Sequence, residues 1–308
     1  MTTALISHPD CFSHINPPGH PEQVARLDAV LGALEGLDPL RVSAPMATED
    51  DLLRVHPKAH VEAVRNIAPE SGLISLDADT HMSPGSLGAA YRAAGACVRA
   101  VDMVLGGEAG NAFCAVRPPG HHAERETPMG FCLFGNLSVA AKYALDHYGL
   151  KRVAIIDFDV HHGNGTQDLL EDDDRVFFAS THQMPLYPGT GYAYEDGAYD
   201  NVLNVPLDPM SGSAAMRSAY SDVVFPAISK FRPELILISA GFDAHRDDPL
   251  AQLNWDTEDF AWVTAGICDL ADACCQGRVV STLEGGYDLT ALGQSTAAHV
   301  KILMGRGK

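Results

Sequence analysis

The stretch VAIIDFDVHHGNG, residues 153–165, joins a short apolar run to a dense group of acidic and imidazole side chains. The apolar run does not alternate with polar residues, which is typical of a strand that helices cover on both faces. Asp157, Asp159 and His161 follow at intervals of two residues, so they point to one side if the strand extends that far. The stretch therefore predicts a buried strand that leads into a polar site.

Similar apolar runs recur along the chain, and helical patterns lie between them. The runs cover residues 4–7, 112–116, 176–180, 202–205, 235–239 and 279–283. The helical patterns cover residues 21–37, 57–67, 86–105, 137–148, 213–231, 257–275 and 289–303. This alternation predicts a doubly wound α/β fold. Since the 308 residues contain no linker or internal repeat, we expect one domain over residues 1–308.

The composition excludes several classes of protein. A formal net charge of -19 argues against binding to nucleic acid or an anionic membrane and favours cationic substrates. The seven cysteines are odd in number and irregularly spaced, which indicates reduced thiols and not a disulfide framework. We find neither a signal peptide nor an apolar stretch long enough to cross a bilayer, so we expect a cytoplasmic protein. The sequence predicts no particular oligomeric state.

Unusual polar residues cluster where five of the predicted strands end. These clusters occupy residues 117–122, 157–165, 180–182, 241–243 and 284–287. Open α/β sheets bind their ligands at the carboxyl ends of the strands. Because packing alone does not explain five strands that deliver His, Asp and Tyr to one edge, the sequence predicts an active site there.

Asp159, His161 and Asp243 are the candidate ligands of a metal ion. Asp243 closes the run SAGFD (239–243), which follows a different apolar strand. Two carboxylates and an imidazole suit a divalent cation that keeps an open coordination position, and such a site accepts Zn²⁺, Fe²⁺ or Co²⁺. The alternative is a hydrogen-bonded Asp/His network at the strand end, but unpaired buried carboxylates are costly.

The adjacent imidazoles of His121 and His122 follow a rigid Pro-Pro-Gly turn. Asp157 is available to orient one ring and raise its basicity, and Asn164 is available to orient the other. A general base beside a metal-activated water is what amide hydrolysis requires. The pair therefore predicts metal-dependent hydrolysis of an amide.

Tyr287 follows Gly285 and Gly286, whose small size lets the backbone approach a ligand closely. A phenol aimed at the metal donates to the developing oxyanion, a contact worth about 3 kcal/mol. Ser180, together with the backbone around Asp157 and His161, is a candidate site for a monovalent cation. The alternative for Tyr287 is an ordinary tyrosine at a strand end.

A series of motifs resembles the zinc-dependent histone deacetylase family, and it extends from about Phe12 to Leu292. The motifs are RPPGHHAE (117–124), GFC (130–132), DFDVHHGNGTQ (157–167), PGTG (188–191), NVPL (204–207), SAGFDAH (239–245), DPL (248–250) and LEGGYDL (283–289). RPPGHH and SAGFDA are similar to the class II branch and its bacterial amidohydrolase members. The resemblance implies a single domain of the arginase-deacetylase fold, with a central, mostly parallel sheet of about eight strands and helices on both faces.

The resemblance also implies roles for individual residues. Zn²⁺ would be bound by Asp159, His161 and Asp243. His122 would be the principal base and acid, while His121, paired with Asp157, would tune the electrostatics. Tyr287 would polarise the acetyl carbonyl.

The resemblance further implies a substrate tunnel and a structural potassium site. Phe131 and Tyr187 would wall the tunnel, Gly130, Gly285 and Leu250 would border it, and Asp79 would be an acidic residue at its rim. The potassium ion would be held by the Asp157 and Ser180 side chains and the carbonyls of Asp159 and His161.

Two positions bear on activity and substrate. Asn164 stands where some members have Asp, and class II members share the Asn. Leu250 stands where the polyamine-selective branch has Glu, which favours a general lysine deacetylase over a polyamine specialist. The substrates that these positions leave open are acetyl-lysine in a protein or peptide and a small acetyl-amine such as an acetylpolyamine. Two other readings are a two-metal arginase-like hydrolase and a non-catalytic protein that binds an acyl ligand.

Overall fold

The apolar runs form the strands of a central sheet in the computed structural model, which describes residues 2–307. The strands are β1 (Thr3–Ser7), β2 (Leu40–Ser43), β5 (Asn111–Cys114), β6 (Val153–Asp157), β7 (Val176–Gln183), β8 (Val202–Leu207), β9 (Leu235–Ala240) and β10 (Val279–Leu283). They pair in the order β2-β1-β5-β10-β9-β6-β7-β8, and every pairing is parallel. The predicted α/β class with an eight-stranded sheet is confirmed. Met1 and Lys308, the ends of the predicted domain, lie outside the described residues.

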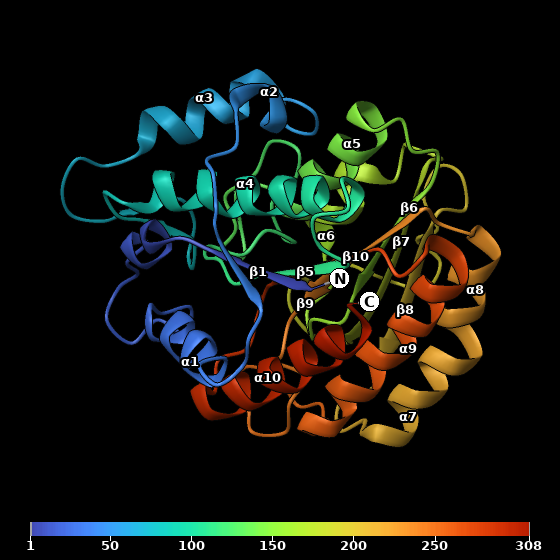
Figure 1. Ribbon diagram of the computed structural model, residues 1–308. Helices are drawn as coiled ribbons and strands as arrows, with labels where there is room; N and C mark the ends of the chain where they lie inside the picture. Colours follow the sequence, from blue (N-terminus) through green and yellow to red (C-terminus); the bar gives the residue numbers. More distant parts are fainter. Residues whose placement is uncertain (1, 308) are drawn as a thin grey trace.

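Helices cover both faces of the sheet, as Figure 1 shows. They are α1 (Ala25–Ala33), α2 (Glu49–Leu52), α3 (Lys58–Ile67), α4 (Ser86–Leu105), α5 (Asn136–His147), α6 (Asn164–Leu170), α7 (Ser213–Ser218), α8 (Phe225–Phe231), α9 (Thr257–Cys275) and α10 (Leu289–Arg306), with a 3₁₀ turn η1 (Pro9–Ser13). Helices α4 and α5 contact one face of the sheet, whereas α9 and α10 contact the other. Each of the seven predicted helical ranges contains a helix.

Burial explains which elements the sequence pattern revealed. Every residue of β6, β9 and β10 is buried, so these strands appear in the sequence as continuous apolar runs. Strand β2 lies at the sheet edge and exposes three of its four residues, which is why no apolar run marked it. The short helices α2 and α6 were missed as well, because one turn or two gives little periodicity to detect.

The helix expected over residues 213–231 contains a wider turn in its middle. Residues Ala219–Val224 form a π-helical segment, η2, between α7 and α8. The segment ends two residues before Pro226, which lies in the first turn of α8. Proline lacks the N–H that an uninterrupted α-helix requires, and the wider turn accommodates this break in the hydrogen-bond pattern.

The two long loops differ in structure. The segment 69–85 contains a small antiparallel hairpin of β3 (Ile74–Ser75) and β4 (His81–Met82). The segment 183–201 begins at the last residue of β7 and forms no further helix or strand before β8. All seven cysteines are unpaired. Among the helices of residues 2–307, none is long and apolar enough to cross a membrane.

Candidate active site

The carboxyl ends of four neighbouring strands lie at the same level of the sheet. Asp157, the last residue of β6, pairs with Ser180 of β7 on one side and with Ser239 of β9 on the other. Leu283, the last residue of β10, pairs with Ala240 at the end of β9. The polar segments that follow these strands therefore start side by side, as the sequence predicted.

Strand β6 ends at Asp157, so it does not extend through Asp159 and His161, which was the condition for these side chains to point to one side as in a strand. Two consecutive side-chain turns replace the strand. Oδ1 of Asp157 accepts the N–H of Asp159 at 3.0 Å, and Oδ1 of Asp159 accepts the N–H of His161 at 2.9 Å. Aspartate favours such a bond to the backbone two residues onward, which explains how the two-residue spacing is used without a strand.

Asp159, His161 and Asp243 converge into one buried group. One ligand atom from each lies within 4.8 Å of the others. Nδ1 of His161 is 3.1 Å from Oδ1 of Asp159 and 3.1 Å from Oδ2 of Asp243. Two carboxylate oxygens and one imidazole nitrogen fit a divalent cation, with further coordination positions open to water or substrate. Within residues 2–307, no other group of three or more His, Cys, Asp or Glu side chains converges in this way.

The electrostatics of the group also favour a cation. Burial acts to lower the pKa of His161, but hydrogen bonds to Asp159 and Asp243 raise it to about 10. Burial, reinforced by the neighbouring charge of Asp159, raises the pKa of Asp243. Each group thus responds to unbalanced negative charge in a buried position, and a divalent cation offsets that charge.

Two glycines let the carboxylates fit against the backbone. A Cβ atom on Gly241 would collide with the Asp159 carboxylate, and one on Gly285 would collide with the carboxylates of both Asp243 and Asp159. Gly285 instead donates its N–H to Oδ2 of Asp159 at 2.8 Å. Gly285 therefore lies behind the metal-ligand group and not in the wall of the cavity, where the sequence had placed it.

The two histidines are each held by the partner that the sequence suggested. Nδ1 of His121 is 3.0 Å from Oδ2 of Asp157, and Nδ1 of His122 is 2.7 Å from Oδ1 of Asn164. Their ring centroids are 4.0 Å apart. Because Nδ1 of His122 faces Asn164 and the residue borders the cavity, its Nε2 atom is the ring nitrogen left available to a ligand.

The environments of the two rings push their protonation in opposite directions. Burial acts to lower the pKa of His121, but Asp159 and Asp157 outweigh it and raise the pKa to about 10. Burial holds the pKa of His122 well below its ordinary value, with further contributions from His121 and His161. Of the two neighbouring rings, His121 therefore holds a proton more readily than His122 does.

A cavity of about 360 Å³ leads from the surface to this group. Its lining residues are His20, Pro21, Ala78, Asp79, His122, Gly130, Phe131, His161, Leu186, Tyr187, Leu250 and Tyr287. Five of the six predicted tunnel residues, all except Gly285, are among them. Tyr187 and Leu250 are 39% and 36% exposed, whereas His122 and His161 are buried, so the cavity runs from a mouth that these two exposed side chains border to a polar inner end.

Tyr287 lies at the inner end with its hydroxyl group unpaired among residues 2–307. Its ring lies 4.9 Å from the Arg26 guanidinium carbon and 5.9 Å from the Phe131 ring. Burial raises the pKa of the phenol well above its usual value, so the hydroxyl keeps its proton. This group is therefore a hydrogen-bond donor available to a ligand.

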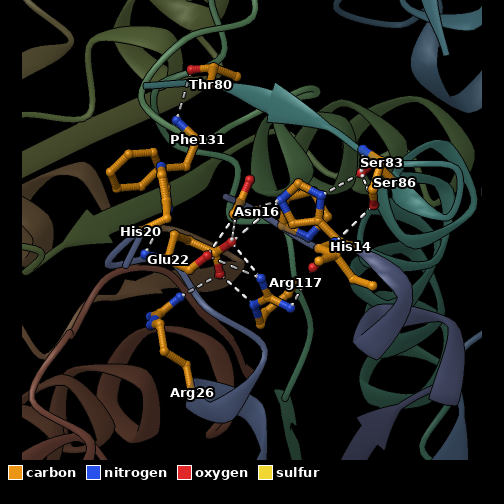
Figure 2. Close-up of polar contacts among 12 residues, drawn as sticks. His14, Asn16, His20, Glu22, Arg26, Thr80, Ser83, Ser86, Arg117 and Phe131 are labelled. Atoms are coloured by element: carbon orange, nitrogen blue, oxygen red, sulfur yellow. Dashed lines mark hydrogen bonds and ion pairs between the residues drawn. The ribbon is translucent and has the colours of Figure 1, made fainter. Parts of the chain in front are cut away.

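A buried ionic cluster, which Figure 2 shows, was not predicted from the sequence. Glu22 accepts hydrogen bonds from Arg26 at 3.0 Å and from both Nε and Nη2 of Arg117. Arg26 also donates to the carbonyl oxygens of Glu284 and Gly286. A Glu and an Arg four residues apart usually form an exposed pair on a helix, so their spacing gave no sign of burial.

Two further residues that were not predicted contact predicted members of the site. The Glu284 carboxylate accepts the N–H groups of Gly120 and His121 at 2.7 and 3.2 Å, which fixes the loop before the histidine pair. His20, which lines the cavity, places Nε2 2.9 Å from the carbonyl oxygen of Asp79 and packs edge-on against Phe131. Glu284 was visible in the LEGGYDL motif, but its bonds join segments more than 160 residues apart.

The predicted potassium ligands also lie together. Asp157 and Ser180 pair across β6 and β7, and the Asp159–His161 turn follows directly. The Ser180 hydroxyl group is 2.9 Å from Nδ1 of His182.

Comparison with known proteins agrees with the motifs. The histone deacetylase domain family matches residues 20–303. The chain is 42% identical to histone deacetylase 10, chloroplastic, of Oryza sativa over 94% of this chain and 71% of that protein. It is 42% identical to the histone deacetylase-like amidohydrolase of Pseudomonas aeruginosa over 89% of this chain and 74% of that protein. The solved HDA15 HD domain superposes with a TM-score of 0.93 at 36% identity, over 99% of this chain and 88% of that structure.

Proposed function

The chain belongs to the histone deacetylase family, and from this premise we propose that it is a zinc-dependent deacetylase that converts an acetylated amine to the free amine and acetate. Membership makes it a hydrolase that acts on acetylated amides. The observation that carries the finer proposal is the cavity, which brings His122, Tyr287 and the metal ligand His161 to one inner end. Zn²⁺ is the proposed ion because the family resemblance implies it and the set of two carboxylates and one imidazole accepts it, as it also accepts Fe²⁺ or Co²⁺.

The proposed metal ligands are Asp159, His161 and Asp243. A divalent cation held there supplies Lewis acidity, which polarises the acetyl carbonyl and lowers the pKa of a water molecule. The two carboxylates are already anchored by backbone donors, because Asp243 accepts the N–H of Val160 and Asp159 accepts the N–H groups of His161 and Gly285, so these two ligands need little reorganisation to bind an ion.

His122 is the proposed general base and general acid. Its Nε2 atom accepts a proton as the water oxygen bonds to the carbonyl carbon, and Asn164 fixes the ring through Nδ1. The carbon–nitrogen bond then breaks, and the same imidazole returns a proton to the departing amine nitrogen. His121, paired with Asp157, contributes positive charge beside the reacting atoms.

Tyr287 is the proposed donor to the carbonyl oxygen. Its unpaired, protonated hydroxyl group faces the cavity, and negative charge develops on that oxygen during attack by water. A donor held in place before the reaction stabilises that charge without reorganisation at the moment of attack.

The proposed substrate stem lies between Phe131 and Tyr187, with Leu250 and Asp79 at the mouth. An apolar wall suits an aliphatic chain, and the carboxylate suits a substrate N–H or ammonium group. Leu250 at the mouth supports an acetyl-lysine substrate, whereas Asp79 and the net charge of -19 support an acetylpolyamine. We also propose a structural K⁺ beside Asp157 and Ser180, bounded by the Asp159–His161 turn.

Turnover of the zinc-loaded protein on an acetyl-lysine peptide and on N-acetylputrescine tests the proposal. Preference for the peptide supports a general lysine deacetylase, and preference for the polyamine assigns selection to acidic groups at the mouth. Turnover of neither substrate would count against the deacetylase assignment. Two metal ions per chain would instead support arginase-like two-metal chemistry.

A further inference from the structure

Asp248 is a buried carboxylate that the proposed mechanism does not use. It follows Asp243 by five residues and is 7% exposed. Both of its oxygens have backbone partners. Oδ1 accepts the N–H of Leu250 at 2.9 Å, and Oδ2 accepts the N–H of Tyr287 at 2.7 Å. The same carboxylate thus hydrogen-bonds to Leu250 at the mouth of the cavity and to Tyr287 at its inner end.

The bond to Leu250 spans two residues, so by itself it is an ordinary side-chain turn. The bond to Tyr287 has a different character because it spans 39 residues and joins two segments that follow different strands. Phe242 and Gly285 also join these segments through a backbone hydrogen bond of 3.0 Å. Two residues after Gly285, the hydrogen bond from Tyr287 to the Asp248 carboxylate joins the same two segments again, next to the phenol.

The backbone before Tyr287 depends on such anchors. Gly286 adopts φ +117°, a conformation that side chains other than hydrogen rarely permit, and two consecutive glycines add freedom. The segment is held by four bonds: Gly285 donates to Asp159 and accepts from Phe242, Gly286 accepts from Arg26, and Tyr287 donates to Asp248. Of these four bonds, only the one to Asp248 involves the tyrosine itself.

The phenol has no anchor of its own at the hydroxyl end. Its hydroxyl group is unpaired within the described chain, and its ring contacts Arg26 and Phe131 only through its faces and edges. The position of the oxygen is therefore decided by the backbone and by ring packing. A shift of the Tyr287 backbone moves the donor relative to the place where the carbonyl oxygen binds.

We propose that Asp248 is a positioning residue that fixes the Tyr287 phenol and, through Leu250, the wall at the cavity mouth. This inference rests on the proposed role of Tyr287 as the donor to the carbonyl oxygen. Asp248 does not line the cavity, so it acts through these two residues and makes no contact with substrate.

The substitution Asp248→Asn tests the inference with little change of volume. The amide has one oxygen and one NH₂ group, so one of the two backbone N–H groups loses its acceptor. We expect the turnover number to fall about ten- to a hundredfold, because a displacement of ~1 Å can cost that much. The matched control is Asp247→Asn, which removes the same charge from a side chain that is 66% exposed.

A merely structural role would give the same loss, so a double-mutant cycle with Tyr287→Phe is needed. If Asp248 acts through the phenol, Asp248→Asn should have almost no further effect on turnover once the hydroxyl group is removed. The turnover number of the double variant should then lie within about threefold of that of Tyr287→Phe. A general weakening of the fold would multiply the two losses instead. Metal content and the unfolding midpoint of each variant report the metal site and the fold separately.

Two outcomes overturn this inference and leave the proposed role of Tyr287 intact. Either the losses multiply in the double variant, or Asp248→Asn turns over like the Asp247→Asn control. If Tyr287→Phe alone retains full turnover, the proposed role of Tyr287 fails and the inference fails with it. That result is distinguishable because it appears in the single Tyr287 variant before Asp248 is changed.

Discussion

Nδ1 of His161 lies 3.1 Å from Oδ2 of Asp243, although 82 residues separate them in the chain. His161 follows β6 and Asp243 follows β9, two strands that are neighbours in the sheet. The same nitrogen lies 3.1 Å from Oδ1 of Asp159. An imidazole facing two buried carboxylates defines where the proposed cation binds.

We expect Asp243→Ala to lose the metal ion. The substitution removes one of three ligands and the only one that comes from β9, which leaves too few donors for tight binding. Metal content after purification and dialysis measures the effect. Asp269→Ala, at a side chain that is 66% exposed, is the control and keeps its metal. Stoichiometric zinc in Asp243→Ala would remove Asp243 from the ligand set.

Tyr287→Phe is expected to slow turnover by about a hundredfold or more while the metal content stays the same. The variant keeps the ring between Arg26 and Phe131 and removes only the donor. Steady-state kinetics with an acetyl-lysine peptide measures the loss, and Tyr194→Phe, at a tyrosine that is 75% exposed, is the matched control. Unchanged turnover would show that the phenol does not stabilise the transition state.

His122→Ala is expected to reduce turnover by about a thousandfold, in the range typical of a lost general base. His122 is held by Asn164 and is not one of the three metal ligands, so the metal content should not change. Asn164→Ala should give a smaller loss, because the imidazole remains but loses the partner that orients it. A larger loss in Asn164→Ala than in His122→Ala contradicts this order of roles.

Asp79 is expected to select cationic substrates. Its carboxylate lines the cavity, and Asp77 lies next to it in the same turn. Asp79→Asn should raise KM about fivefold for N-acetylputrescine and leave KM nearly unchanged for N-butylacetamide, which has the same stem without the ammonium group. Added salt should weaken the preference of the unaltered protein in the same direction. An equal change in KM for both substrates would mean that Asp79 acts through the shape of the cavity and not through its charge.

The buried His299 is expected to make the fold acid-sensitive. It lies against three phenylalanine rings and hydrogen-bonds with Thr264 and Ser281, and burial lowers its pKa from 6.5 to about 3. Between these two values the unfolded chain binds a proton that the folded chain does not. The free energy of unfolding should therefore fall as pH decreases from 6.5 towards 3, by about 1.4 kcal/mol per pH unit from this residue.

Denaturant unfolding of His299→Gln at several pH values measures this contribution. The variant should be less stable than the unaltered protein above pH 7, because two buried hydrogen bonds change, and the difference should shrink as the pH falls. Parallel stability curves for the two proteins from pH 7 to pH 5 would show that His299 does not titrate on unfolding.

The local pattern of the chain was enough to predict most of the elements. Strand β10 and helices α4 and α9 have the predicted bounds, because a continuous apolar run and a period of 3.6 residues are visible within one segment. The edge strand β2 and the wide turn before Pro226 were not predicted. An exposed strand has no apolar run in its sequence. The pattern of polar and apolar residues shows that a helix is present but does not distinguish a π-helical turn from an α-helical one.

The types of residue at the strand ends were also sufficient to predict the candidate site. The sequence placed Asp159, His161, Asp243, the histidine pair and Tyr287 at one edge, and the described structure brings them together. It missed Glu22, Arg26, Glu284 and Asp248, whose importance lies in their partners. A charged residue looks the same in a sequence whether its partner is water or a buried backbone group.

The sequence by itself determined the fold class, the order of the strands along the chain and the chemistry available at their ends. These follow from local periodicity and from the rule that parallel strands present their carboxyl ends at one edge. Only the tertiary structure decided which strands are neighbours, that Glu22 pairs with both Arg26 and Arg117, and that Asp248 reaches Tyr287. Such contacts depend on how the whole chain packs, because side chains far apart in sequence meet only after the helices have covered the sheet.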